Sequence, residues 1–229
     1  MAKQLVLKAS VFDFLDKLKK NNNREWFNAH KDDYLQELAI VEQFAESLLQ
    51  ELKTHDEIET LSGKDSLYRI YRDTRFSKDK TPYKQHWAGS FKRATKYRRG
   101  GYYFHLEPGN TFVAGGFWGP EKEDLKRIRE EIAFDATPLR KILQAKTFVN
   151  NFGALQGEQL KVMPKGYDAK HEAIDLLRFK QFILKKDFPD EVVFSGQFLK
   201  EMSNGFKQMR PFLDYMSDVL TTDINGESL

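Results

Sequence analysis

The chain has 229 residues, of which 40% are hydrophobic and 14% aromatic, a composition typical of a folded globular protein. It contains no cysteine, which excludes disulfides, thiolate zinc sites, iron–sulfur clusters and cysteine nucleophiles. The formal net charge of +3 does not by itself predict a polyanion partner. The sequence has no long apolar stretch and no secretory pattern at its N-terminus, so we expect a cytoplasmic protein with no membrane-spanning segment and no membrane partner.

Two amphipathic helices are predicted near the N-terminus. The first begins at Ser10 and carries an apolar stripe at i, i+3, i+4 and i+7, formed by Val11, Phe14, Leu15 and Leu18. Asn21-Asn22-Asn23 ends this helix and supplies an N-cap for the next one. The second helix keeps a helical period from Trp26 to about residue 53.

The pattern changes from residue 66, where short aromatic-rich segments are bounded by glycine, proline or charged clusters. These segments are SLYRIYRD, HWAGSFKR, GYYFHLEP and NTFVAGGFW, and their composition is typical of strands. Glu107-Pro108-Gly109-Asn110 is expected to form the turn between the last two, because Pro-Gly favours a turn. We therefore predict an antiparallel sheet of about four strands between residues 66 and 118.

Helices are predicted again after the strands. Gly119-Pro120 and Thr137-Pro138 each place a proline just inside a helix start. Residues 163–168 are expected to form a loop, and a helix from Ser195 is expected to kink at Pro211. Helices, then strands, then helices indicate an α+β fold with N- and C-terminal helices flanking the sheet, and we expect one domain over the whole chain.

Positive charge is concentrated between residues 64 and 99. This stretch holds twelve basic and three acidic residues, a local net charge of +9, whereas the rest of the chain has a net charge of −6. Its most basic segment is RIYRDTRFSKDKTPYK, residues 69–84. A strand here would place Arg69 and Arg72 on opposite faces, so at least one guanidinium would be partly buried and would need a carboxylate or an anionic ligand. Asp73 is the nearest carboxylate in the sequence.

The second half of this segment is expected to form an ordered loop, because Thr81-Pro82 favours extended geometry and Ser77 and Asp79 are turn residues. Arginine suits bidentate contact with phosphate, lysine adds charge, and aromatic rings stack on bases. The predicted anion site consists of Arg69, Tyr71, Arg72, Asp73, Arg75, Lys78, Lys80, Tyr83 and Lys84. Two structural interpretations compete with it: the arginines form internal salt bridges, and the lysines are solvated surface residues.

Three further residues complete the predicted set. Strand alternation puts His105 on one face with Tyr103 and Glu107, which indicates either an acid–base group or a hydrogen-bonded structural histidine. Lys165 and Tyr167 would join the anion site if their loop folds over the sheet. No catalytic motif and no metal-ligand spacing is recognised, so no catalytic residue, metal site or cofactor is predicted.

Five stretches together resemble one family: NNNREWFNAHKDDY, RIYRDTRFSKDKTPYK, GGYYFHLEPG, GGFWGP and MPKGYD. In this order, over about residues 10–215, they resemble the bacterial and fungal family catalogued as domain of unknown function 2461. The resemblance implies a single intact domain whose shared features lie in these stretches. It implies no activity.

The residues favour one function and leave two alternatives open. The first hypothesis is a protein that binds a phosphate-bearing ligand, such as a small molecule, a nucleotide or a nucleic acid, through the segment 69–84. The alternatives are a non-catalytic protein-interaction domain whose arginines form internal salt bridges, and an enzyme without a recognised motif. The sequence leaves the ligand, the presence of catalysis and the oligomeric state open.

Overall fold

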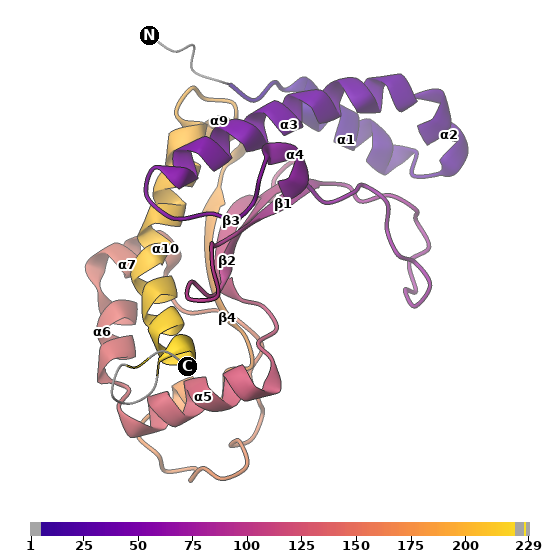
Figure 1. Cartoon of the computed structure of the whole chain (residues 1–229). Helices are drawn as coiled ribbons and strands as arrows, with labels where there is room; N and C mark the ends of the chain where they lie inside the picture. Colours follow the sequence, from indigo (N-terminus) through magenta and orange to yellow (C-terminus); the bar gives the residue numbers. More distant parts are fainter. Residues whose placement is uncertain (1–5, 223–226, 228–229) are drawn as a thin grey trace. The chain divides into compact units, whose positions relative to one another are not determined.

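The computed structural model describes residues 6–222 and 227 (Figure 1). It contains a four-stranded antiparallel sheet with the order β1-β2-β3-β4. The strands are β1 (Trp87–Lys92), β2 (Gly101–Leu106), β3 (Thr111–Phe117) and β4 (Phe182–Phe188). Helices come from both ends of the chain, so the predicted α+β fold with a four-stranded sheet is confirmed.

The chain divides into two compact units, which are described separately. The first unit comprises Met1–Phe91, Tyr103–Val113 and Asp187–Asn204. The second comprises Lys92–Tyr102, Ala114–Lys186 and Gly205–Leu229. The expectation of one domain over residues 1–229 stays a prediction. Within the described residues, no helix is long and apolar enough to cross a membrane.

The first unit is built on paired N-terminal helices. Its helices are α1 (Ser10–Lys20), α2 (Arg24–Ala29), α3 (Lys31–Lys53), α4 (Gly63–Ser66), α9 (Asp190–Val193) and the start of α10 (Phe198–Thr221). The apolar stripe predicted for the first helix is the buried face of α1, which packs against α3. The buried face of α3 includes Val41, Phe44, Leu48 and Leu52. Removal of this apolar surface from water is the main stabilisation of the unit.

Consecutive asparagines shape the turn between α1 and α2. Asn21 Nδ2 donates to the Lys17 carbonyl at 3.0 Å, and Asn23 Oδ1 accepts from the Trp26 amide at 2.9 Å, so Asn23 is the expected N-cap. The single long helix predicted after it is wrong: the chain forms α2 and α3, with His30 between them at φ −114° and ψ 26°. The His30 ring stacks on the Trp26 ring with centroids 4.1 Å apart, which stabilises the break.

The strand predicted at residues 66–73 is wrong, and the fourth strand comes from a distant segment. Residues 67–73 pair only through isolated bridges, Leu67 with Gly89 and Tyr71 with Tyr83. Neither face of this segment is consistently apolar, so burial does not fix its register in a sheet. The fourth strand is β4, which pairs with β3. The predicted turn is confirmed, because residues 107–110 join β2 to β3.

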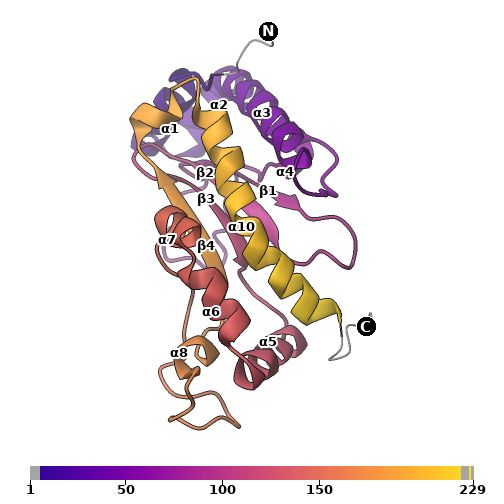
Figure 2. The same ribbon diagram turned by 90° about the vertical axis from the view of Figure 1, so that its left-hand side faces the viewer.

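The second unit contains the helices that follow β3. They are α5 (Lys122–Phe134), α6 (Thr137–Gln144), α7 (Lys146–Phe152), α8 (Ile174–Leu177) and the remainder of α10. Figure 2 shows α10 running alongside α6 and α7. Pro138 lies in the first turn of α6 as predicted, and Pro211 lies inside α10. Gly115 of β3 lies close to α10, because a Cβ added there would be 2.6 Å from Met209 Sδ.

A buried guanidinium joins the residue after β1 to α10 within the second unit. The Arg93 side chain is 0% exposed and forms an ion pair with Asp214. Its Nη1 also donates to Ser217 Oγ and to the Arg99 carbonyl, each at 3.2 Å. These bonds offset the cost of removing the guanidinium charge from water.

Candidate functional site: a basic pocket at the base of the loop 72–81

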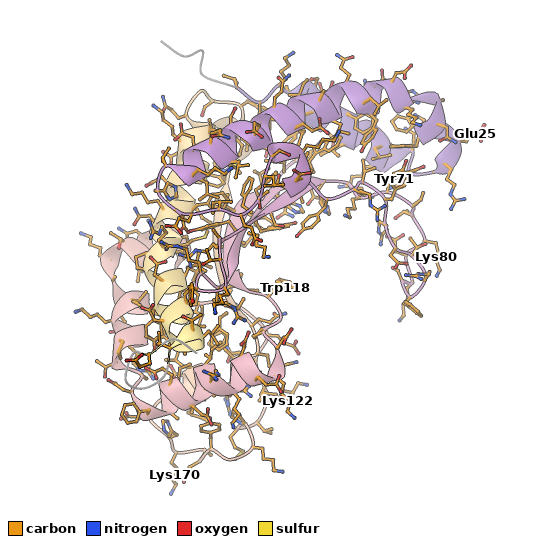
Figure 3. The ribbon with its side chains drawn as sticks, in the orientation of Figure 1. Glu25, Tyr71, Lys80, Trp118, Lys122 and Lys170 are labelled. Atoms are coloured by element: carbon orange, nitrogen blue, oxygen red, sulfur yellow. The ribbon has the colours of Figure 1, made fainter. Side chains whose placement is uncertain are left out.

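Residues 70–84 form a loop with a paired base. The Lys84 amide donates to the Ile70 carbonyl at 2.7 Å, and the Arg72 amide donates to the Pro82 carbonyl at 2.9 Å. We call residues 72–81 the cationic loop. In Figure 3, Tyr71 lies at its base near α2, and Lys80 lies farther out on the loop. The predicted anion-site residues of this segment are therefore divided between the base and the outer part of the loop.

Asn22 and Phe27 fix the base of the cationic loop. Asn22 Nδ2 donates to the Tyr83 carbonyl at 3.0 Å, and Asn22 Oδ1 accepts from the Tyr83 amide at 3.1 Å. The Phe27 ring stacks on the Tyr83 ring with centroids 4.0 Å apart, and both residues are buried. Because a buried backbone group without a partner is costly, these contacts hold the returning arm of the loop in one position.

Two arginines of the cationic loop pair with aspartates of the same loop. Arg72 Nη1 contacts Asp79 Oδ2 at 2.5 Å and also donates to both oxygens of Thr81. Arg75 binds Asp73 through two nitrogens, with Nε 3.0 Å from Oδ1 and Nη2 2.7 Å from Oδ2. Asp73 thus pairs with Arg75 rather than with Arg72. Arg75 therefore fits the interpretation in which the arginines form internal salt bridges, because a carboxylate occupies the edge that would bind a phosphate through two hydrogen bonds.

The loop contacts also keep its aspartates ionised. The Thr81 amide donates to Asp79 Oδ1 at 2.9 Å, and this bond and the Arg72 guanidinium lower the pKa of Asp79 to about 2. Hydrogen bonds from the side chain and the backbone of Arg75 lower the pKa of Asp73. Exposed ion pairs contribute little to global stability, so these contacts chiefly determine the shape of the loop.

A pocket of about 320 Å³ lies at the base of the cationic loop. This basic pocket is lined by Arg24, Asn28, Tyr71, Arg72, Thr74, Pro82 and Tyr83. The lining has two guanidinium groups and no carboxylate. Among the described residues, Arg24 has no ion-pair partner. The hydrogen bonds of the Arg72 side chain to described residues all come from Nη1. Its Nε and Nη2 donate to no residue that the structure describes.

Neutral polar groups complete the lining of the basic pocket. Burial and then the neighbouring Tyr71 raise the pKa of Tyr83, whereas the positive charge of Arg24 lowers it by a smaller amount. The Tyr83 hydroxyl therefore stays protonated at neutral pH. Together with the Asn28 amide and the Thr74 hydroxyl, it adds hydrogen-bonding capacity to the two guanidinium groups.

The remaining predicted cations of the segment lie outside the lining of the basic pocket. Arg69 is exposed, and its carbonyl accepts a hydrogen bond from Lys84 Nζ at 2.7 Å. Burial and then the charge of Arg69 lower the pKa of Lys84. Lys80 Nζ donates to the Thr74 carbonyl at 2.8 Å, and Lys78 is exposed. These four residues add positive charge around the base and along the cationic loop.

Lys165 and Tyr167 belong to the second unit, in the segment between α7 and α8. Burial and then the charge of Glu130 raise the pKa of Tyr167, while Arg129 lowers it. All residues that line the basic pocket belong to the first unit. The participation of Lys165 and Tyr167 in an anion site therefore stays a prediction.

His105 lies in a second polar cluster of the first unit, at the end of β2. It is 7% exposed, and its Nδ1 is 2.9 Å from Tyr103 Oη while its Nε2 is 3.0 Å from Glu107 Oε2. The three side chains that strand alternation places on one face thus form a hydrogen-bonded chain. Burial disfavours the Glu107 carboxylate, but hydrogen bonds from Asn110 and His105 more than compensate, so the pKa of Glu107 is lower than usual.

His86, which the sequence analysis did not select, completes this second cluster. It directly precedes β1, and its ring centroid is 4.2 Å from that of His105. The pairing of β1 with β2 explains why two residues 19 positions apart lie together. Burial, and then the proximity of His105, lowers the pKa of His86 to about 4, so its imidazole is neutral near pH 7.

The comparison with protein families gives one result. A family model described as conserved hypothetical protein, DUF2461, matches residues 10–215. This chain belongs to the DUF2461 family. Neither the curated proteins nor the solved structures include a match to it. Both the cationic loop and the cluster of His86, His105 and Glu107 lie within the part of this DUF2461 protein that the family model covers.

The basic pocket of this DUF2461 protein includes two residues from outside the segment 69–84 that sequence reasoning missed. Arg24 and Asn28 lie on α2, one helical turn apart, and so face the same direction. Both occur in NNNREWFNAHKDDY, one of the stretches that carry the family resemblance. The family resemblance of this stretch is the sequence feature that could have identified the two residues. The spacing of the residues on α2 does not connect this helix with a loop about fifty residues later.

Proposed function

We propose that this chain binds a phosphate-bearing small molecule in the basic pocket. The observation that carries this proposal is the pair of guanidinium groups of Arg24 and Arg72 in a pocket whose lining has no carboxylate. A guanidinium group presents a planar set of donors that matches the oxygens of a phosphate. An anion in the pocket would give Arg24 the partner that the described residues do not supply.

The two arginines have different roles in this proposal. Arg24 would bind a phosphate through two parallel hydrogen bonds. Arg72 is held by Asp79 and Thr81 through Nη1, which orients its Nε and Nη2 edge without occupying it. Arg75 contributes through the shape of the loop, because Asp73 occupies its Nε and Nη2 donors. Lys78, Lys80 and Lys84 would strengthen the positive field that attracts an anion.

The size of the basic pocket favours a small ligand. Its volume of about 320 Å³ is at the lower end of the range of small-molecule pockets, about 300–1,000 Å³. A sugar phosphate or a nucleoside phosphate would place its phosphate between the arginines and its ring beside Tyr71. A cytoplasmic location is part of the proposal, and the cysteine-free composition is consistent with a reducing compartment.

Isothermal titration calorimetry with pyrophosphate, ribose 5-phosphate and adenosine monophosphate tests the proposal. We expect at least one of these probes to bind, and Arg24→Ala to weaken its binding by about 10- to 100-fold, because a hydrogen bond to a charged group contributes about 1.5–3 kcal/mol. Arg24→Lys should restore part of the affinity, because lysine keeps the charge and loses the bidentate geometry.

Arg127→Ala is the matched control for Arg24→Ala. Arg127 is exposed on α5 in the second unit, and its substitution removes the same charge and a side chain of the same size. It should leave the affinity unchanged at physiological ionic strength. Equal losses in the two variants, or no heat from any of the three probes, would contradict a site in the basic pocket.

A second candidate function, docking of a protein partner without catalysis, is supported by a different observation. Arg72 and Arg75 both have aspartate partners within the cationic loop, and Phe76 between these pairs is 96% exposed. Substitution of Phe76 by alanine separates the candidates. It should leave phosphate affinity intact and reduce partner binding, since Phe76 does not line the basic pocket.

A further inference from the structure

The cluster beside β1 and β2 brings together three side chains that commonly bind metal ions. His86, His105 and Glu107 each offer one ligand atom, and these three atoms all lie within 4.8 Å of one another. His105 is buried, and His86 and Glu107 are half-buried. All three belong to the first unit and none lines the basic pocket, so a role for this cluster is independent of phosphate binding there.

We propose that His86, His105 and Glu107 bind one divalent transition-metal ion, with Zn²⁺ as the expected occupant. Two imidazole nitrogens and a carboxylate oxygen form a donor set that Zn²⁺ uses in proteins. Ligand atoms about 2.0–2.2 Å from a tetrahedral ion lie about 3.5 Å from one another. His105 Nε2 and Glu107 Oε2 are already 3.0 Å apart, so coordination requires only small side-chain movements.

Two of the three ligands have hydrogen-bond partners that would orient them toward an ion. Tyr103 Oη lies 2.9 Å from His105 Nδ1, so a proton on Nδ1 donated to the tyrosine leaves the Nε2 lone pair for the metal. Asn110 Nδ2 donates to Glu107 Oε2 at 2.7 Å. Such outer partners fix the tautomer and the direction of metal ligands.

His86 distinguishes a metal site from a purely structural histidine. A structural His105 is already satisfied by Tyr103 and Glu107 and does not need a second imidazole beside it. Yet the His86 ring lies 4.2 Å from the His105 ring, and within the described part of the chain its nitrogens form no hydrogen bond. A purely structural role for His105 therefore leaves the position of the second imidazole unexplained, whereas a metal site uses a nitrogen of His86 as its third ligand atom.

The number of protein ligands indicates what kind of site this would be. Structural zinc ions have four protein ligands, whereas three protein ligands leave a position for water or for an oxygen of a bound molecule. A Zn²⁺ ion on His86, His105 and Glu107 would therefore be of the open kind. Its water would have a lowered pKa, and the ion would polarise a carbonyl or phosphoryl oxygen placed on the open position.

Metal titration of the full chain without a histidine tag tests this inference. After dialysis against a chelator, we expect Zn²⁺ to bind with a stoichiometry of one ion per chain in calorimetry. Co²⁺ should give the visible absorption of a low-coordinate site. His86→Ala and Glu107→Gln should each weaken Zn²⁺ binding by at least about 100-fold, and Tyr103→Phe by about 10-fold, as expected for the loss of a ligand and of an outer partner.

His171→Ala is the control, because His171 lies in the second unit, far along the chain from the three ligands. It should bind Zn²⁺ as the unsubstituted chain does. A second experiment uses the unsubstituted chain, so that it does not depend on the folding of a variant. Bound Zn²⁺ should slow the modification of His86 by diethyl pyrocarbonate, measured by mass spectrometry. Unchanged Zn²⁺ affinity in a folded His86→Ala chain, or modification of His86 at the same rate with and without Zn²⁺, would overturn the proposal.

Discussion

Substitution of Asn22 by alanine should release the base of the cationic loop. The Asn22 side chain forms two hydrogen bonds, at 3.0 and 3.1 Å, with the carbonyl and the amide of Tyr83. A typical intramolecular hydrogen bond contributes about 0.5–1.5 kcal/mol, so the loss of two should destabilise this arm by about 1–3 kcal/mol. The upper half of this range is favoured because Tyr83 is 3% exposed and water does not easily replace the lost partner.

Hydrogen exchange at the Tyr83 amide measures this effect directly. A loss of about 1–3 kcal/mol in the free energy of local opening corresponds to an exchange rate about 5- to 150-fold higher. Because Tyr83 and Arg72 both line the basic pocket, the affinity for the phosphate probe should fall as well. The free energy of global unfolding, measured in urea, should decrease by a similar or smaller amount. The reason is that the local opening that exposes the Tyr83 amide involves only part of the structure that unfolds globally.

Asn21→Ala is the control for this experiment, because Asn21 is the neighbouring residue of the same type. Its side chain donates to the Lys17 carbonyl at the exposed end of α1, and its removal should change stability by less than about 0.5 kcal/mol. If Asn22→Ala leaves the Tyr83 amide as protected as Asn21→Ala does, then the asparagine does not anchor the loop and the reasoning fails.

Three further predictions concern other parts of the chain. The ordinary pKa of an aspartate, 3.8, is lowered to about 2 for Asp79 in the folded chain, so its contribution to loop order should be complete above about pH 4 and lost as the pH falls through about 2, measured by NMR titration of the carboxyl carbon. Gly89→Ala should destabilise the first unit by about 1–3 kcal/mol in urea unfolding, because its Cβ would lie 2.6 Å from the Phe104 ring. Asp214→Asn should cost about 3 kcal/mol in the same assay, since it removes the ion pair between Asp214 and the buried guanidinium of Arg93.

Each of these predictions has a defined contradiction. A midpoint near 4 for Asp79 would mean that the Thr81 amide and Arg72 do not bind its carboxylate in solution. Gly119→Ala is the control for Gly89, because no atom lies within 4 Å of a Cβ added at Gly119, and equal losses would exclude a steric cause. Asp124→Asn breaks a more exposed arginine pair and should cost less than Asp214→Asn.

The sequence correctly predicted the elements that are determined by residues close together in the chain. The apolar stripe of α1 and the cap at Asn23 follow from residues within one or two helical turns, and both are confirmed. The turn at residues 107–110 follows from Pro-Gly in the same way. The strand β4 was missed because FILKKDF places two lysines and an aspartate in its second half, and its pairing with β3 depends on residues about 65 positions earlier.

The candidate site was predictable only in part, for the same reason. The segment 69–84, which the sequence analysis selected, contains five residues of the basic pocket, namely Tyr71, Arg72, Thr74, Pro82 and Tyr83. Arg24 and Asn28 come from α2, and only the folded chain brings that helix to the base of the loop. The proximity of His86 to His105 depends on the register of β1 against β2, which the strand pattern alone does not specify.

The contacts that shape the cationic loop determine which changes in its sequence would affect the rest of the chain. Its ion pairs, Arg72 with Asp79 and Arg75 with Asp73, and the bond from Lys80 to the Thr74 carbonyl all join residues at most seven positions apart. The arms below are fixed by Asn22 and Phe27 instead. A substitution at the tip of the loop, such as one at Phe76, therefore requires no compensating change in α1, α2 or α3.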